Sequence, residues 1–200
     1  AGRPDHRRPR NTCVTAIADG EGRSPYEVVY DYMLEDDGRA MLFAPDNNYL
    51  DYSNDACREL IEHPRGIVAV GDGGAHAAHI SDISFPTYVM SYWGRDRPEG
   101  ALDLGFLVRQ ITSETAHVVG LSDRGIIAPG YKGDLNVIDM ERLSIARPYM
   151  AHDLPLGAKR LLQRADGYVA TIVSGVPIYR DGAATGAWPG RLVRGPQPAP

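Results

Sequence analysis

Cysteine is scarce in this sequence, with Cys13 and Cys57 the two cysteines in 200 residues. Neither has a close-spaced cysteine partner, which argues against a disulfide framework and a Cys-x-x-Cys metal knuckle. Long apolar runs are also missing: none approaches the roughly 20 residues that cross a bilayer, and no secretory signal opens the chain. We therefore expect a soluble protein with no membrane partner, and the cysteine usage favours a reducing cytoplasm.

Basic residues are fewer than acidic ones: the sequence has 21 Lys and Arg and 26 Asp and Glu, which gives a net charge of -5. Nucleic-acid-binding domains concentrate basic residues to neutralise phosphates, so no nucleic-acid partner is expected. Arginines do gather at the N-terminus, at Arg3, Arg7, Arg8 and Arg10. Prolines interrupt them and no aromatic residue is present to stack on a base, so a solvated, irregular segment is favoured over a phosphate site.

The length also sets a limit. A chain of 200 residues has room for one ordinary domain, whereas a complete β/α barrel needs roughly 250 residues. Barrel motifs in this chain would therefore belong to a barrel that is completed outside it.

Helical patterns dominate the first 119 residues. Ser24-Pro25-Tyr26-Glu27 is a capping box, and the helix that it starts should stop at the acidic segment from Glu35 to Gly38. Gly120 is well placed to end the last of these helices. The other predicted helices span Thr12–Ala18, Ala56–Glu62 and Asp103–Val119.

Two strands are expected among these helices, and more follow them. Gly66–Val70 is a continuous apolar run, typical of a strand buried on both faces of a parallel sheet, and Ala40–Ala44 is a shorter candidate. Beyond Gly120, glycine turns alternate with β-rich runs, which predicts an antiparallel sheet or sandwich. These runs are residues 125–127, 134–139, 168–173 and 176–179, and the tail from Pro196 to Pro200 should be disordered.

The segment Gly71-Asp72-Gly73-Gly74-Ala75-His76 directly follows the predicted buried strand. In β/α folds, loops at the carboxyl ends of strands carry catalysis. Asp72 and His76 supply a carboxylate and an imidazole within five residues, a pairing suited to a general base or to metal ligation. The alternative is a tight structural turn.

The other histidines carry less chemistry. His79 lies three residues after His76, which suggests either a metal pair or, as we favour, surface or hydrogen-bonded residues. His63 is expected to fix the entry to the strand at Gly66. Structural or exposed roles are expected for His6, His117 and His152.

Three stretches in this order resemble the amidohydrolase superfamily, and within it the N-acyl-D-amino-acid deacylase (D-aminoacylase) branch. They are residues 22–27 with 32–38, the step from His63-Pro64-Arg65 to Gly71-Asp72-Gly73, and residues 121–139, and the similarity runs from about Thr12 to Gly195. The resemblance implies an α/β fold: residues 1–119 as the C-terminal part of a distorted β/α (TIM-like) barrel, and residues 120–200 as strands of a small β-sandwich with a disordered tail.

The resemblance also implies a function, the zinc-dependent hydrolysis of carbon–nitrogen bonds in a small-molecule amide. Asp72 matches the aspartate after the last barrel strand, which binds or faces the metal and passes a proton from water to the leaving amine. Asp72 is thus the expected catalytic and metal residue, and His76 and Gly73 are expected on the substrate side.

Two departures from the family pattern qualify this expectation. The His-x-His pair and the later metal-binding histidines have no counterparts, so we expect an inactive isolated chain that pairs with a missing N-terminal half or a second copy. In addition, Ile80–Ser84 lacks the arginine that often meets the substrate carboxylate. The alternatives are a hydantoinase-like enzyme of cyclic amides and a metal-free interaction domain.

Overall fold

The longest helix begins as the sequence predicts. In a computed structural model, which describes residues 8–45, 48–49 and 52–200, helix α2 spans Pro25–Gly38. The hydroxyl of Ser24 accepts a hydrogen bond from the amide of Tyr26 at 3.3 Å, and the Ser24 amide donates to the Glu27 carboxylate at 2.9 Å. The backbone leaves helical geometry from Glu35 to Asp37, so the acidic segment ends the regular helix.

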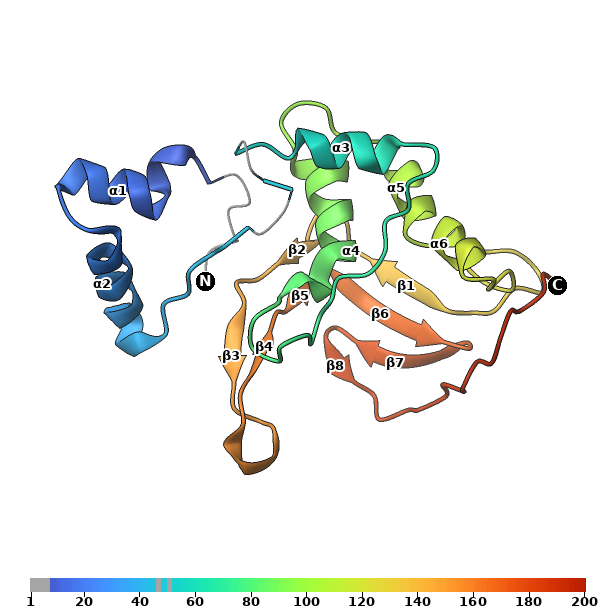
Figure 1. The fold of residues 1–200 in the computed structure, drawn as a ribbon. Coiled ribbons are helices and arrows are strands. Elements are labelled where there is room, and N and C mark those ends of the chain that lie inside the picture. The colour runs from blue at the N-terminus through green and yellow to red at the C-terminus, as the bar shows by residue number, and fades with distance from the viewer. Residues whose placement is uncertain (1–7, 46–47, 50–51) are drawn as a thin grey trace. The chain divides into compact units, whose positions relative to one another are not determined.

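The chain divides into two units, and the division falls between Gly66 and Ile67. The first unit, drawn in blue to teal in Figure 1, is helical, and α1 packs on α2 around the buried residues Ala18 and Val28. The predicted strand over residues 40–44 is wrong, because this segment is irregular and Phe43 is 70% exposed. Besides α2, the elements are η1 (Arg10–Thr12), α1 (Val14–Glu21) and α3 (Asp55–Glu62). His6, Arg3 and Arg7 lie outside the described residues.

The second unit combines short helices with short strands (Figure 1). Its helical elements are η2 (Asp82–Ser84), α4 (Phe85–Tyr88), the π-helix η3 (Val89–Asp96), α5 (Leu104–Gln110), α6 (Ser113–Val118) and η4 (Pro155–Gly157). Its strands are β1 (Leu135–Ile138), β2 (Ser144–Ile145), β3 (Tyr149–Ala151), β4 (Arg160–Leu162), β5 (Ala165–Asp166), β6 (Tyr168–Val173), β7 (Val176–Arg180) and β8 (Ala183–Ala184).

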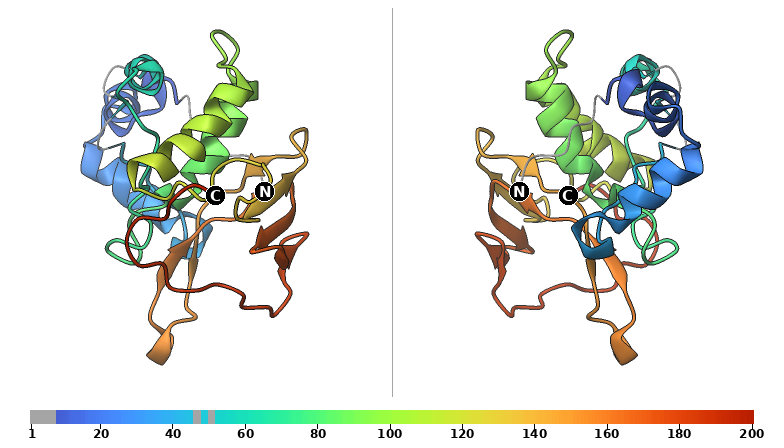
Figure 2. Two further views of the ribbon diagram at one scale, coloured as in Figure 1. Left: turned by 90° about the vertical axis from the view of Figure 1, so that its right-hand side faces the viewer. Right: turned by 90° about the vertical axis from the view of Figure 1, so that its left-hand side faces the viewer.

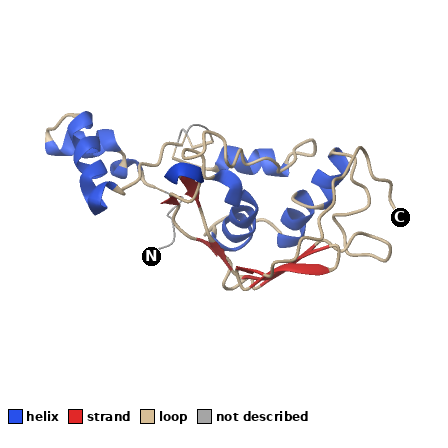
Figure 3. Ribbon diagram, turned by 90° about the horizontal axis from the view of Figure 1, so that it is seen from below, coloured by secondary structure: helices blue, strands red, loops and turns tan. Residues whose placement is uncertain are grey.

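The strands pair antiparallel, which confirms that prediction. The main sheet has the order β1-β6-β7-β8, and β2 pairs with β5 and β3 with β4 in separate ladders. Helices α4 to α6 lie on one side of the main sheet, as Figures 2 and 3 show from different directions. A β-sandwich stays a prediction, and so does the assignment of residues 1–119 to a barrel. Gly120 itself lies inside the second unit, where helices give way to strands.

The core of the second unit joins its helices to its strands. Trp93, Leu107 and Leu143 are the largest fully buried side chains. Arg95 in η3 donates to the carbonyl of Leu143 at 2.8 Å, and the hydroxyls of Thr87 in α4 and Tyr168 in β6 lie 2.7 Å apart. Burial and polar contacts thus fix η3 and α4 against the strand segments.

The predicted buried strand Gly66–Val70 is wrong. These residues are irregular, Val70 has a φ of 57°, and its side chain is 80% exposed. Among the described strands, none pairs with this run. A strand in the middle of a parallel sheet takes its hydrogen bonds and its burial from neighbours on both sides, so an apolar run without such neighbours has no reason to stay extended.

The predicted helix over residues 103–119 is instead two helices, α5 and α6. Asp103 caps α5 by accepting from the amide of Phe106 at 2.7 Å. The break lies at Thr112, whose hydroxyl donates to the carbonyl of Val108 at 2.6 Å, a side-chain bond that competes with the helix ladder. Gly120 follows α6 with a φ of 78°, as a C-terminal cap requires.

Two segments of the C-terminal region also differ from expectation. Residues 125–127 are irregular rather than a strand, and a bend covers residues 124–126. The tail, which was expected to be disordered, runs along the chain after α6. There the amide of Gln197 donates to the carbonyl of Gly120 at 2.8 Å, and the amide of Ser122 donates to the carbonyl of Gln197 at 2.9 Å. Backbone pairing therefore gives the tail a place that its composition does not predict.

Candidate active site

The candidate site lies on residues 71–79, here called the Asp72 loop, which is a run of turns. Asp72 itself has a φ of 42° and an exposed side chain, and its carbonyl accepts a hydrogen bond from the amide of Ala75 at 2.9 Å. An exposed carboxylate at the start of a tight turn is open to solvent and to a ligand. The tight turn considered as the alternative is therefore present, and it leaves the carboxylate accessible.

Close packing holds the first part of the Asp72 loop on η2. A Cβ added at Gly71 would collide with the carbonyl oxygen of Asp82, and one added at Gly73 would lie 2.5 Å from the Cβ of Ile83. Real Cβ atoms do not come this close to other atoms, so the packing of the loop on η2 requires glycine at both positions. The glycines beside Asp72 therefore have a local packing reason.

A backbone bond holds the far part of the Asp72 loop. His76 and Ala77 have φ values of 53°, in the left-handed region that non-glycine residues seldom adopt. The carbonyl of Ala77 accepts from the amide of Leu161 in β4 at 3.0 Å. Residues in this region persist when their surroundings over-determine them, and β4 supplies such a constraint.

The two histidines of the loop lie near each other. The rings of His76 and His79 are exposed, with centroids 6.3 Å apart at an interplanar angle of 79°. In the first unit, Nδ1 of His63 accepts from the amide of Arg65 at 3.1 Å, a local bond that fixes the turn before Gly66. His152 and His117 are both exposed; Nδ1 of His152 lies 3.4 Å from the carbonyl of Gly157.

A zinc site needs three protein ligands in an open catalytic centre and four in a structural one. In the part of the chain that the structure describes, no group of three or more His, Cys, Asp and Glu side chains is placed to hold a metal ion. Asp72, His76 and His79 therefore do not form a complete metal site by themselves.

Two polar side chains near the Asp72 loop were missed by the sequence analysis. Ser84, the last residue of η2, donates its hydroxyl to Oε1 of Gln163, which follows β4. Nε2 of Gln163 donates in turn to the carbonyl of Ala146 at 2.9 Å. Ser84 and Gln163 are 79 positions apart, and no local pattern in the sequence connects them.

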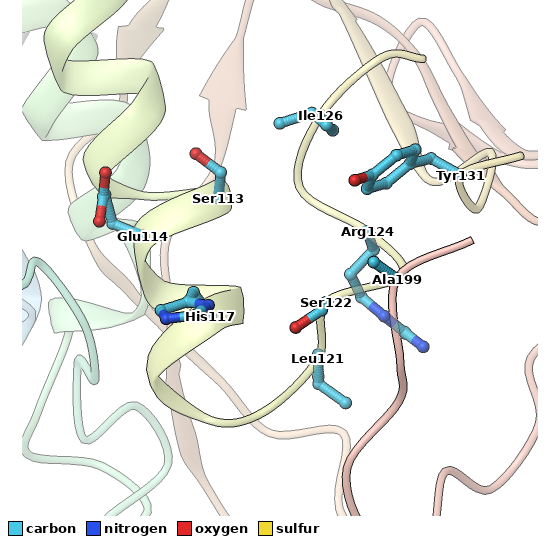
Figure 4. Close-up of a pocket in the computed structure, with 9 residues that line it drawn as sticks. All are labelled: Ser113, Glu114, His117, Leu121, Ser122, Arg124, Ile126, Tyr131 and Ala199. Carbon is cyan, nitrogen blue, oxygen red and sulfur yellow. The ribbon is translucent and has the colours of Figure 1, made fainter. Parts of the chain in front are cut away.

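A cavity of about 410 Å³ lies elsewhere in the second unit, between α6, the chain after it and the C-terminal tail (Figure 4). The positive charge of Arg124, which lines this cavity, is largely neutralised, because Arg124 pairs with Asp123 at 2.7 Å. This hydrogen bond lowers the pKa of the Asp123 carboxyl. Asp72, Gly73 and His76 are not in its lining. The lining residues are Ser113, Glu114, His117, Leu121, Ser122, Arg124, Ile126, Tyr131 and Ala199.

Comparison with protein families decides the relationship. The amidohydrolase family matches residues 11–179, which is most of the chain and includes the Asp72 loop. The chain belongs to the amidohydrolase family. This confirms the resemblance found in the sequence. A comparison with curated proteins gave no significant match to this amidohydrolase.

Solved structures of D-aminoacylase share the fold of this amidohydrolase. One is described as defining a novel subset of amidohydrolases, and it is 22% identical to this chain with a TM-score of 0.50. The matched region covers 87% of this chain and 32% of the D-aminoacylase chain. A second, from work on one-metal activation and second-metal attenuation of a binuclear metal centre, gives the same values. A third, a variant in complex with copper chloride, is 21% identical. The amidohydrolase chain thus spans about a third of the length of these structures.

None of the helices in the described segments is both long and apolar enough to cross a bilayer. The cytoplasmic localisation stays a prediction.

Proposed function

We propose that this chain is the C-terminal part of a metal-dependent hydrolase of carbon–nitrogen bonds in small-molecule amides other than peptides, related to D-aminoacylase. The family match over residues 11–179 carries this proposal. The D-aminoacylase neighbours support it through their fold, and one of them is described as having a binuclear metal centre.

In this proposal Asp72 is the proton-transfer residue. Its carboxylate is exposed at the start of the Asp72 loop, where a water and a substrate can reach it. A carboxylate within hydrogen-bond distance of a water takes its proton and returns it to the leaving amine. His76, on the same loop, contacts the substrate. A metal in the complete enzyme would polarise the amide carbonyl, and we assign most of its ligands to residues outside this chain.

The remaining part of the enzyme is the proposed partner of this chain, either as a separate N-terminal half or through a second copy. The exposed apolar side chains around the irregular run from Ile67 to Val70 support this proposal. Neighbouring barrel strands would give that run the pairing and the burial that it lacks.

The substrate has two candidate classes. N-acyl-D-amino acids are the first, by relation to D-aminoacylase. Cyclic amides are the second, favoured by the chemistry next to the Asp72 loop, where Gly73 packs on Ile83 and Asp82 is exposed. A carboxylate and an aliphatic side chain there do not attract a substrate carboxylate as an arginine would. Rates with N-acyl-D-amino acids and cyclic ureides, on an active enzyme that contains this chain, separate the two classes.

The test of the proposal is Asp72→Asn in such an enzyme. We expect kcat/KM to fall by about 10²- to 10⁴-fold, since the amide cannot take the proton, while the thermal unfolding midpoint stays unchanged. Asp166→Asn, at an exposed carboxylate on β5, is the matched control and should retain activity. Activity of Asp72→Asn near the wild-type level would overturn the assignment.

Metal content tests the assignment of the ligands. After dialysis, elemental mass spectrometry of the purified 200-residue chain should find less than about a tenth of an equivalent of zinc, because a stable site needs three or four protein ligands. A zinc content close to one equivalent would contradict the assignment and would indicate a site that includes Asp72, His76 or His79.

A further inference from the structure

The position of the Asp72 loop depends on the short helix η2. Gly71 and Gly73 lie against the backbone of Asp82 and the side chain of Ile83, so close that no side chain fits between them. Asp72 stands between these two glycines. Any displacement of η2 therefore displaces the backbone on both sides of the Asp72 carboxylate.

Gln163 connects η2 to the strand region. Its Oε1 accepts from the hydroxyl of Ser84, the last residue of η2, and its Nε2 donates to the carbonyl of Ala146 at 2.9 Å. Both ends of the amide are thus engaged, and the side chain is half-buried. A planar amide held at both ends fixes the distance between its two partners.

The same stretch of chain holds the other end of the Asp72 loop. The amide of Leu161, two residues before Gln163, donates to the carbonyl of Ala77 at 3.0 Å. Residues 161–163 therefore reach the loop at two places: through the backbone near His76, and through Gln163 and η2 near Asp72. Loops with several left-handed residues keep one conformation when the surrounding structure fixes them at more than one point.

We propose that Gln163 is a positioning residue that holds the Asp72 carboxylate in place through Ser84 and η2. This inference rests on the proposed function for its catalytic meaning, because the position of Asp72 matters only if Asp72 transfers a proton. The bond from Leu161 to Ala77 limits the freedom of the loop at its other end, so the loss of Gln163 loosens the Asp72 side of the loop most.

The experiment is amide hydrogen exchange on the 200-residue chain, read by NMR, in the wild type and in Gln163→Ala. We expect the Ala75 amide, which bonds to the carbonyl of Asp72, to exchange about 10-fold faster or more in the variant, since local opening sets its rate. Amides of β6 should keep their protection. Arg164→Gln, at the adjacent exposed residue whose side chain bonds to Tyr149, is the matched control and should leave the loop unchanged.

Further variants separate positioning from general damage to the fold. Gln163→Glu keeps an acceptor for Ser84 but has no donor for the carbonyl of Ala146, so it should loosen the loop as Gln163→Ala does. Ser84→Ala should loosen the loop as Gln163→Ala does, and the double variant should add little. If Gln163→Ala also exposes β6, Ser84→Ala decides the question. Unchanged exchange at Ala75 in Ser84→Ala, or wild-type exchange at Ala75 in Gln163→Glu, would overturn the proposal.

In an active enzyme that contains this chain, Gln163→Ala should lower kcat several-fold with little change in KM, since the acid–base group is misplaced while the substrate contacts remain. A rise in KM at constant kcat would contradict a positioning role. Failure of the proposed function is seen separately, because it requires wild-type activity in Asp72→Asn and leaves the exchange of Ala75 unaffected.

Discussion

The two units of the chain differ in how sequence and packing contribute to them. The first has the clearest local signals, such as the Ser24 capping box and the Arg58–Glu62 pair at 2.8 Å in α3. Its buried apolar residues, among those described, are Ala18 and Val28, while Tyr26 is 87% exposed. The second unit has short elements but buries Trp93 and other large side chains. Local signals start helices, but burial supplies most of their stability.

The largest expected difference between the units concerns burial. Leu143→Ala should lower the free energy of unfolding of the second unit by about 2–5 kcal/mol, since it leaves a cavity beside fully buried neighbours. Tyr26→Ala, in the first unit, should change the free energy of unfolding of that unit by less than about 0.5 kcal/mol. Urea unfolding measures both: the fluorescence of the buried Trp93, in a background with the exposed Trp188 replaced by phenylalanine, follows the second unit, and circular dichroism follows the helical first unit. Equal effects of the two variants would remove the contrast.

A second prediction concerns the close approach at the Asp72 loop. Gly73→Ala should destabilise the second unit by about 1–3 kcal/mol, because the added methyl meets the Cβ of Ile83 at 2.5 Å. In α1 of the first unit, a Cβ at Gly20 meets nothing within 4 Å, so Gly20→Ala should stabilise by about 0.5–1 kcal/mol. Opposite shifts in the thermal midpoint are the expected result. A stabilising Gly73→Ala would show that the loop does not pack on η2.

The capping box offers a smaller effect within the first unit. Ser24→Ala should cost about 1 kcal/mol of helix stability, because the amide of Tyr26 loses its acceptor. Ser24→Asp keeps an acceptor and should restore the wild-type value. Circular dichroism at low denaturant concentrations follows α2. If alanine and aspartate behave alike at this position, the cap does not hold the helix.

A chemical effect, confined to one thiol, also lies in the first unit. Hydrogen bonds, first from the Thr15 side chain and then from the backbone at Ala16, lower the pKa of Cys13 from 9.0 to about 7. Since the thiolate is the nucleophile, alkylation of Cys13 in a Cys57→Ser variant should speed up as pH rises, with its midpoint near 7.

Thr15→Val, which removes the first of these hydrogen bonds, should move the alkylation midpoint towards 9.0. A midpoint of 9.0 already in the parent variant would contradict the predicted environment of Cys13.

The fold was predictable from the sequence wherever a short stretch of residues determines a helix end or a strand by itself. The capping box starts α2, Gly120 ends α6, and alternating β-rich runs form β1, β6 and β7. The order of three motifs gave the family, which the match over residues 11–179 confirms. For the candidate site, the sequence predicted Asp72 and its glycines but not the contacts that hold them.

Tertiary structure decided the rest, because each remaining feature depends on residues far apart in the chain. The run at Ile67–Val70 is apolar enough for a buried strand, but a strand also needs partners, and Val70 adopts a left-handed conformation instead. The amide of Gln197 donates to the carbonyl of Gly120, and Gln163 accepts from the hydroxyl of Ser84, although the partners are far apart in the sequence. Composition sets what such groups can bond to, while the folded chain alone determines which groups meet.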